Sequence, residues 1–305
     1  METWKRTVYI SLVCVFCTAF GVSQLAPILP LYFHDLGVQT PEAMSLWSGL
    51  ATGATYIIVC LAAPFWGRVA DKKGRKITLI RSSFGMALCN ALIAFQTTPE
   101  GVVLIRLIQG LVSGFYSASI TLIASETPIE RTGWALGQLA SANLAGSLIG
   151  PLLGGYIADT VGIRNDFIIV GALMGLAGVL ATIFIHENYV PQPNPEKLSI
   201  RKLKEQIPEF NSIVALCVAS FIYAICIMSL QPVISVYIKG IVPSDTENLA
   251  FIAGAVFSAM GIAQLMSSSP LGKLVDKIGP RKVLVVSLIY VGILNIPQAY
   301  VSDVY

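Results

Sequence analysis

Long uninterrupted apolar segments are the feature that most restricts how this chain can fold. Each has about 20 residues, the length at which an α-helix crosses the ~30 Å hydrocarbon core of a bilayer. Only 12% of the residues are Asp, Glu, Lys or Arg, 55% are apolar, and the mean hydropathy is +0.73. These values lie far from those of soluble globular domains. The chain is therefore predicted to be a polytopic membrane protein.

Nine membrane-spanning helices are expected from these segments. Lipid offers no hydrogen-bond partners to the backbone, so a long apolar segment must be helical, and none shows the alternation of a β-barrel strand. The predicted fold class is therefore all-α. The first segment leads directly into further segments, so we expect it to be retained rather than cleaved as a signal peptide. The expected spans are residues 8–33, 46–66, 77–97, 101–123, 135–158, 167–186, 212–238, 249–271 and 283–301.

The positive charges between the spans predict the orientation, because Lys and Arg in short loops stay in the cytoplasm. With a cytoplasmic N-terminus, sixteen of the twenty Lys and Arg residues fall in inner segments, and only Arg164 and Lys239 fall in outer loops. Arg81 lies near the inner start of the third span, where its side chain can snorkel to the membrane surface. The net charge of +3 reflects this topology and does not indicate binding to nucleic acid.

A repeat of 205 residues divides the chain into two related parts. GRVADKKGRK, which begins at Gly67, recurs as GKLVDKIGPR from Gly272, and the same shift places Pro27 on Pro232. A six-span unit duplicated in one orientation explains this pattern. The expected organisation is an N-terminal six-helix half at 1–186, a cytoplasmic linker at 187–211 and a partial C-terminal half of three helices at 212–305.

The repeat also predicts where a complete second copy would end. The first copy runs to about His186, and adding 205 gives residue 391, whereas the sequence ends at Tyr305. We therefore expect the chain to be C-terminally incomplete, with an external C-terminus and without counterparts of spans four to six. A nine-span protein that completes itself by oligomerisation is the alternative.

Three motifs and several shorter segments resemble one family. The loop GRVADKKGRK with its degenerate copy resembles the signature between spans two and three of the major facilitator superfamily. The segment from Arg106 to Gly110 resembles the R-x-x-x-G-type motif of that family's fourth span. APILPLYF, WSGL and residues 63–67 are similar to the MdtG-like and PmrA-like multidrug efflux transporters of its drug/proton antiporter branch. The resemblance covers the whole chain and implies the major facilitator fold.

The glycines of the fifth span resemble the motif associated with the antiporters of that superfamily. Small residues recur every four positions along this span, which lets a neighbouring helix approach closely, and a proline inside the helix bends it. The resemblance implies that this surface helps to seal the outward side. The residues concerned are Gly146, Gly150, Pro151, Gly154 and Gly155.

The loop between spans two and three is interpreted as a gate. Its cationic residues can act simply as topological anchors, but an acid at one place in both copies suggests more. Asp71 can cap the N-terminus of a neighbouring helix or pair with Arg75, giving a contact that breaks when the halves move. The resemblance adds partners after the fourth span. The expected gating residues are Gly67, Asp71, Arg75, Lys76, Glu126 and Arg131, with Asp276 and Arg281 in the second copy.

Arg106 is the only charged residue inside the expected fourth span, on a small and polar helical face. Such a face commonly serves close helix packing, but an ionised side chain inside a membrane is costly unless it faces water or a partner. The resemblance implies a role in proton coupling. The expected cavity residues are Gln24, Gln109, Ser113 and Asn143.

Proton exchange also needs a group that titrates, which arginine does not do. None of the seventeen acids falls in the middle of an expected span. Asp35, beside His34 at the outer end of the first span, is the predicted second coupling residue, and the alternative is that it merely ends the helix.

The sequence gives no indication of an enzyme, a cofactor or a metal site. The six cysteines all fall in apolar spans, and the CxxC pair of Cys14 and Cys17 has no His or carboxylate beside it. No phosphate-binding loop, HExxH or GxSxG motif is present in the sequence. We therefore expect neither catalysis nor a bound cofactor.

The expected function is secondary active export of drugs or amphipathic compounds in exchange for protons by alternating access. Expected partners are these small molecules, protons and the lipid bilayer, without nucleic acid, and the full-length protein is expected to be a monomer. The expected location is the bacterial plasma membrane. Alternatives are an uptake carrier or facilitator for a small polar metabolite, and a non-transporting membrane sensor or scaffold.

Overall fold

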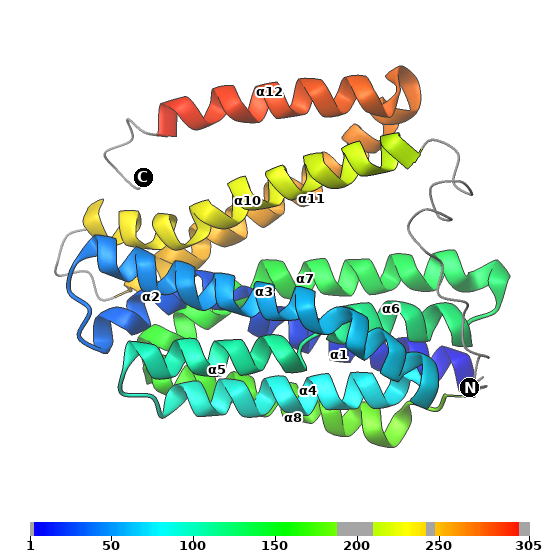
Figure 1. Ribbon diagram of the computed structural model, residues 1–305, viewed down its shortest axis with the longest axis horizontal. Helices are drawn as coiled ribbons and strands as arrows, with labels where there is room; N and C mark the ends of the chain where they lie inside the picture. The colour runs from blue at the N-terminus through cyan, green and yellow to red at the C-terminus, as the bar shows by residue number, and fades with distance from the viewer. Residues whose placement is uncertain (1–2, 188–209, 242–247, 299–305) are drawn as a thin grey trace.

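The computed structural model describes residues 3–187, 210–241 and 248–298, and every regular element in these ranges is an α-helix (Figure 1). The helices are α1 (Thr3–Ser23), α2 (Leu25–Asp35), α3 (Pro41–Lys73), α4 (Arg75–Ala94), α5 (Pro99–Val112), α6 (Phe115–Glu126), α7 (Ile129–Val161), α8 (Ile163–Phe184), α10 (Phe210–Ile241), α11 (Leu249–Ile278) and α12 (Pro280–Gln298). The predicted all-α class is confirmed. Nearly all of the expected linker falls outside the described residues.

Helices lie at all nine positions where spans were expected. Within the described residues, seven helical segments are long and apolar enough to cross a membrane. They are α1, α3, α4, α5 together with α6, α7, α8 and the first part of α11. Helices α10 and α12 coincide with the seventh and ninth expected spans.

Two of the expected spans are interrupted. The first divides at Gln24, where the hydrogen bonds from Gln24 N to Phe20 O and from Ile28 N to Gln24 O are 3.4 and 3.3 Å long. Pro27 follows closely, and a proline inside a helix removes one backbone donor and displaces the preceding turn. The fourth divides at Gly114, whose φ of +113° suits a residue without a Cβ. The expectation of one helical face along the whole fourth span is therefore wrong.

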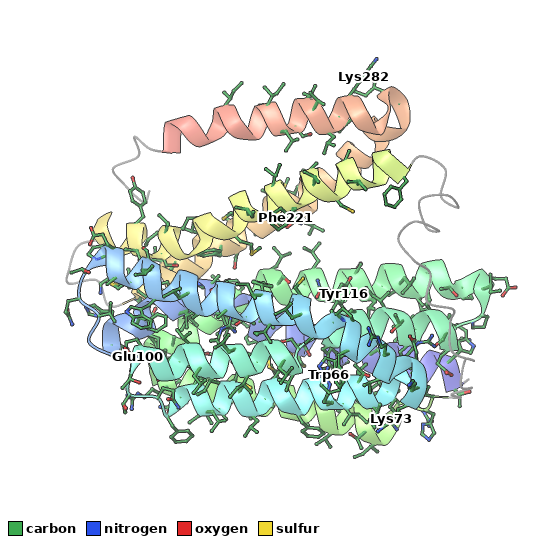
Figure 2. The ribbon with its side chains drawn as sticks, in the orientation of Figure 1. Trp66, Lys73, Glu100, Tyr116, Phe221 and Lys282 are labelled. Carbon is green, nitrogen blue, oxygen red and sulfur yellow. The ribbon has the colours of Figure 1, made fainter. Side chains whose placement is uncertain are left out.

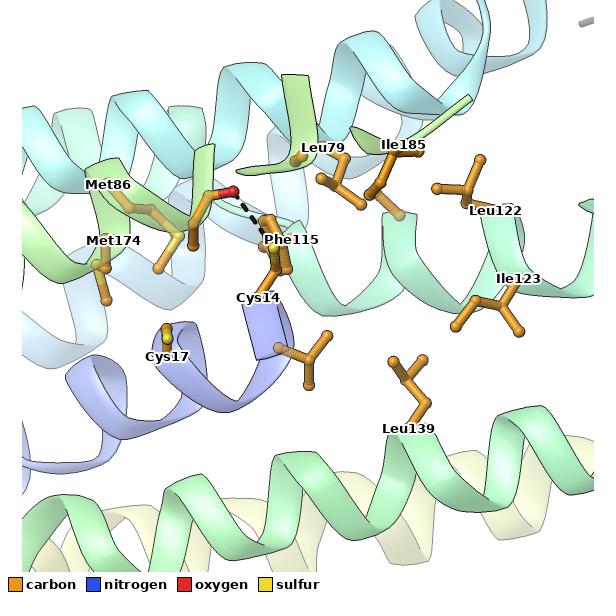
Figure 3. Packing of buried hydrophobic residues seen from close by; sticks show 14 of the residues in the cluster. Cys14, Cys17, Leu79, Met86, Phe115, Leu122, Ile123, Leu139, Met174 and Ile185 are labelled. Atoms are coloured by element: carbon orange, nitrogen blue, oxygen red, sulfur yellow. Dashed lines mark hydrogen bonds between the residues drawn. The ribbon is translucent and has the colours of Figure 1, made fainter. Parts of the chain in front are cut away.

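Two hydrophobic clusters hold the first eight helices together. Helix α1 packs on α7 and α8, α4 packs on α8, and α3 packs on α5. One cluster joins α1, α4, α6, α7 and α8, and Figure 3 shows it from close by. Cys14 belongs to this cluster, where its thiol donates to the carbonyl oxygen of Ala177 at 3.3 Å. Cys14 and Cys17 are buried side chains of α1.

The helix boundaries follow the 205-residue repeat. Helix α3 ends at Lys73 and α11 ends at Ile278, which is 205 residues later. Each is followed by a glycine with positive φ, +93° at Gly74 and +86° at Gly279, before the next helix begins. An L-residue with a side chain rarely adopts this conformation, so the turn explains why both copies keep the glycine.

Different helix ends and turns lie at the two ends of the helical bundle. One end, here called the basic end, contains the start of α1, the α3–α4 turn and the end of α8, with Lys73 beside that turn (Figure 2). The opposite end contains Glu100, the α7–α8 turn and the start of α11. Helix α11 packs on α7 and α2, and α10 packs on α2 and α3. Helix α10 diverges from α7 towards the basic end (Figure 1).

Candidate functional site

Arg106 lies in the interior of the bundle, on α5 where α3 covers it. Its side chain is 6% exposed, and Nη1 donates to Gln109 Oε1 at 2.7 Å. The Nε atom has no partner among the described residues. Thr55 of α3 donates from its hydroxyl to the Arg106 carbonyl at 3.0 Å, and a Cβ on Gly110 would stand 2.5 Å from the Thr55 carbonyl oxygen. A cation therefore sits at a tight helix–helix contact with a neutral amide as its partner.

The break between α5 and α6 is covered by Arg81 and Trp66. Arg81 donates from Nη1 to the Leu111 carbonyl at 3.1 Å and from Nη2 to the Ser113 carbonyl at 3.0 Å. Trp66 donates from Nε1 to the same Leu111 carbonyl at 2.7 Å, and the Arg81 guanidinium lies 3.5 Å from the Trp66 ring centre. These donors satisfy carbonyls that a continuous helix would pair internally. Arg81 thus has hydrogen-bond partners at this break, and its snorkelling to the membrane surface stays a prediction.

Gln24 and Asp166 form a buried polar pair between the break in the first span and the first turn of α8. Both side chains are 0% exposed, and Gln24 Nε2 donates to Asp166 Oδ2 at 3.0 Å. Sequence reasoning missed Asp166 because the sixth span was expected to begin at residue 167, which put this acid in a loop. Gly162, with φ +89°, ends α7 abruptly, and α8 begins at the next residue. A glycine followed by a new helical segment is the signal that could have placed Asp166 inside the helix.

The glycines of α7 form the contact surfaces of two other helices. A Cβ on Gly146 would stand 2.5 Å from the Phe16 carbonyl oxygen of α1, and a Cβ on Gly154 would stand 2.7 Å from Gln24 Cβ. Gly155 lies instead against the backbone of Ala250 in α11. The remaining members of the predicted antiporter motif, Gly150 and Pro151, are buried in the same helix. The one motif thus contacts both α1 and α11.

Asp159, one turn beyond these glycines, joins α7 to the start of α11. Its carboxylate accepts from the backbone N–H groups of Ala250 and Phe251 at 3.2 and 2.7 Å. A carboxylate at a helix N-terminus satisfies donors that have no partner within the helix and interacts favourably with the helix dipole. Nothing in the sequence alone distinguished this acid from others at the membrane edge.

The predicted gating residues lie at the basic end, on several helices. Gly67 and Asp71 are exposed near the end of α3, Glu126 ends α6, and Arg131 is exposed near the start of α7. Asp276 lies on α11 and Arg281 on α12, and the side chains of both fall outside the described part of the structure.

Glu187 is a further acid at the basic end that sequence reasoning did not select. Its carboxylate accepts from the backbone N–H groups of Arg75 and Lys76 at 2.7 and 2.8 Å. The first turn of α4 is thereby fixed to the segment that follows α8.

The other predicted site residues are placed as follows. Asp35 ends α2 with an exposed side chain, and its Oδ1 lies 3.8 Å from His34 Nδ1. Gln109 is 1% exposed beside Arg106. Ser113 donates to the Gln109 carbonyl at 2.6 Å, and Asn143 is partly buried on α7. The expected cavity residues are thus distributed over α5, α7 and the α1–α2 break.

Comparison with known proteins identifies the family. Residues 11–304 match the Major Facilitator Superfamily. The chain belongs to this superfamily. It is therefore a multi-pass membrane transporter rather than an enzyme, as the sequence resemblance implied.

Among relatives of this major facilitator are two bacterial multidrug resistance proteins. It is 37% identical over 302 residues to multidrug resistance protein MdtG of Proteus mirabilis, covering 99% of this chain and 75% of that protein. It is 39% identical over 300 residues to MdtG of Dickeya zeae, covering 98% of this chain and 73% of that protein. The chain thus spans about three quarters of the length of these relatives.

Solved structures show the same fold at low sequence identity. The human organic anion transporter MFSD10 superposes with a TM-score of 0.62 at 17% identity, covering 86% of this chain and 71% of that one. The major facilitator fold is confirmed.

Proposed function

We propose that this major facilitator exports drugs or amphipathic compounds in exchange for protons, by alternating access. The observation that carries the proposal is 37–39% identity to multidrug resistance proteins over nearly the whole chain. The proposed organisation is the six-helix half at 1–186, the linker at 187–211 and the helices of the second half at 212–305. The proposed orientation places the N-terminus and the basic end in the cytoplasm of a bacterial cell, because positive loops stay inside.

The contacts between the two proposed halves support alternating access. Between α7 and α11, Asp159 accepts from Ala250 and Phe251 near the opposite end, and Ser258 donates to the Leu148 carbonyl at 2.7 Å further inside the two helices. With the basic end in the cytoplasm, we propose that these contacts help to close the outward side. In the alternate state we propose that these contacts separate while Asp71 and its neighbours hold the basic end closed.

The buried polar groups support a role in transport rather than in a sensor or scaffold. A guanidinium in a membrane interior is unfavourable, and Arg106 has one neutral hydrogen-bond partner within the described residues. We propose that Arg106 belongs to the coupling site, with Gln109 as its partner, and Asp35 remains a candidate for the titrating group.

The test is transport by the protein in inside-out vesicles energised with a proton gradient. We expect accumulation of amphipathic dyes that is abolished by an uncoupler, and loss of this uncoupler-sensitive part in Arg106→Ala at equal expression. Dye accumulation that is unchanged by the uncoupler would contradict proton coupling. Uptake of a small polar metabolite in place of dyes would favour the alternative carrier function.

A further inference from the structure

Asp166 stands out among the acids of the described residues because it is completely buried and incompletely hydrogen-bonded. Its side chain is 0% exposed, Oδ2 accepts from Gln24 Nε2 at 3.0 Å, and Oδ1 has no partner among the described residues. An ionised carboxylate in an apolar interior normally needs several donors or an opposite charge. One neutral amide donor does not meet this need.

Gln24, the partner of Asp166, also has one oxygen without a hydrogen-bond partner. Gln24 is also 0% exposed, and its carbonyl oxygen Oε1 has no hydrogen-bond partner within the described residues. The two oxygens without partners thus belong to the two side chains that already share one hydrogen bond. Both are acceptors while the acid is ionised, so neither can satisfy the other.

A single proton on Asp166 would give both oxygens a hydrogen-bond partner. A proton taken from water and bound to Oδ1 turns that oxygen into a donor, for which Gln24 Oε1 is the available acceptor, while Nε2 continues to donate to Oδ2. A carboxylic acid and a primary amide can form two hydrogen bonds in this way. The reaction is proton binding alone, and no covalent bond of the chain changes otherwise. The pair is therefore built for the protonated acid.

Three charged or titratable groups on the elements around Asp166 are hydrogen-bonded to other partners. Arg164, on α8 itself, donates to the Gln96 carbonyl at 3.4 Å, and Asp159 of α7 accepts from the start of α11. The Tyr32 hydroxyl of α2 donates to the Ile93 carbonyl at 2.8 Å. The remaining titratable groups on α1, α4 and α7, the helices packed on α8, are Lys5, Arg6, Tyr9, Cys14, Cys17, Arg75, Lys76, Arg81, Cys89, Glu130, Arg131 and Tyr156.

Gln24 connects this pair to the surface where the proposed halves meet. Its side chain packs on Gly154 of α7, where an added Cβ would stand 2.7 Å from Gln24 Cβ and 2.9 Å from Cδ. The next residue, Gly155, packs on the backbone of Ala250 in α11. A reorientation of Gln24 on loss of the proton would therefore press on the helix that holds α11.

We propose that Asp166, paired with Gln24, is the side chain that carries the exchanged proton and favours the state in which α7 and α11 are in contact. The proposal rests on the drug/proton exchange proposed above and assigns its titrating group. It replaces Asp35, which is exposed at the end of α2.

The first test measures drug binding to the purified protein as a function of pH. Proton exchange predicts that wild-type binding weakens as the pH falls and that drug binding releases protons. Asp166→Asn places an amide where the protonated acid would stand, and an amide can still exchange two hydrogen bonds with Gln24. This variant should therefore stay folded, bind drug without the pH dependence, and lose uncoupler-sensitive efflux.

The second test observes the proton directly and needs no drug. Infrared difference spectra between high and low pH should contain the carbonyl band of a buried protonated carboxylic acid, and Asp166→Asn should remove it. Glu100→Gln is the matched control, because Glu100 is also an acid in the first turn of a helix at the opposite end but is exposed. The control variant should retain the band.

The outcomes separate this inference from the proposed function. Wild-type protein that binds no drug at any pH would contradict the proposed function, while the infrared band would still decide whether Asp166 binds a proton. A band or a pH dependence that survives in Asp166→Asn, or that is lost in Asp35→Asn instead, would overturn the inference.

A second variant covers the case in which Asp166→Asn does not fold. Gln24→Met removes the amide and keeps a side chain of similar length, so it should change the pH midpoint of the infrared band. An unchanged midpoint would show that Gln24 and Asp166 do not act as a pair.

Discussion

At each end of the molecule a carboxylate caps the start of a helix, but the two caps join different parts of the chain. At the basic end, Glu187 accepts from the backbone N–H groups of Arg75 and Lys76 at the start of α4. At the opposite end, Asp159 accepts from Ala250 and Phe251 at the start of α11. Each carboxylate satisfies free helical donors. The first cap joins the first residue of the proposed linker to α4 of the six-helix half, whereas the second connects the two proposed halves.

The surroundings of the two caps explain why one can be permanent and the other reversible. The Glu187 cap is reinforced by Lys76 Nζ, which donates to the Thr182 carbonyl at 2.9 Å. The Asp159 cap is accompanied by backbone contacts of glycines, Gly155 on Ala250 and Gly254 on the Pro151 carbonyl. Close backbone contacts at glycines leave few side chains between the two helices, so the helices can separate as rigid bodies. We therefore expect the first cap to persist through transport and the second to break.

The largest expected effect comes from adding a methyl group at the reversible contact. Gly155→Ala places a Cβ within 2.9 Å of Phe251 Cα and against the Ala250 backbone, neither of which can move alone. Overpacking of this kind costs about 1–3 kcal/mol, so the α7–α11 contact should weaken by that amount. The measurement is the cross-linking yield between cysteines placed at Tyr156 and Phe251, whose ring centres are 6.4 Å apart, in a cysteine-free background. Gly137→Ala is the control, because nothing lies within 4 Å of its Cβ position. Equal yields in both variants would refute close packing at Gly155.

A smaller effect is expected from the charge of the reversible cap. Asp159→Asn keeps the shape of the side chain but leaves one acceptor for two N–H donors and removes the charge. The contact should weaken by about 1–2 kcal/mol, which is about a five- to thirtyfold change in the ratio of joined to separated states. Distance distributions between spin labels on α7 and α11 should broaden towards longer separations. Distributions identical to those of wild type would show that Asp159 does not hold the halves together.

The smallest effect on the α7–α11 contact is expected from a substitution at the Glu187 cap. Glu187→Gln should lower the stability of the protein by about 1 kcal/mol through its weaker cap on α4. It should leave the cross-linking yield at the opposite end unchanged. Thermal unfolding in detergent measures the first effect, with Glu130→Gln, an exposed acid in the first turn of α7, as the control. A change in the opposite-end contacts caused by Glu187→Gln would remove the distinction between the two caps.

The sequence by itself determined where the helices of this protein lie, apart from the breaks at Gln24 and Gly114. Its apolar segments predicted helices at all nine positions, because the length of a span depends only on bilayer thickness and local hydropathy. The repeat predicted equivalent turns, and Gly74 and Gly279 both adopt positive φ. The family resemblance of the motifs was also correct. These features are local in the chain, so neighbouring residues suffice to specify them.

The tertiary structure decided which polar groups meet. Gln24 and Asp166 are 142 residues apart in the chain, and Asp159 lies 91 residues before Ala250. Arg81 covers a helix break whose accepting carbonyls lie 30 and 32 residues further along the chain. In the sequence, the acid that becomes buried looks the same as the acid that caps a helix. Only the packing of distant helices excludes water from Asp166 and brings backbone N–H donors to Asp159.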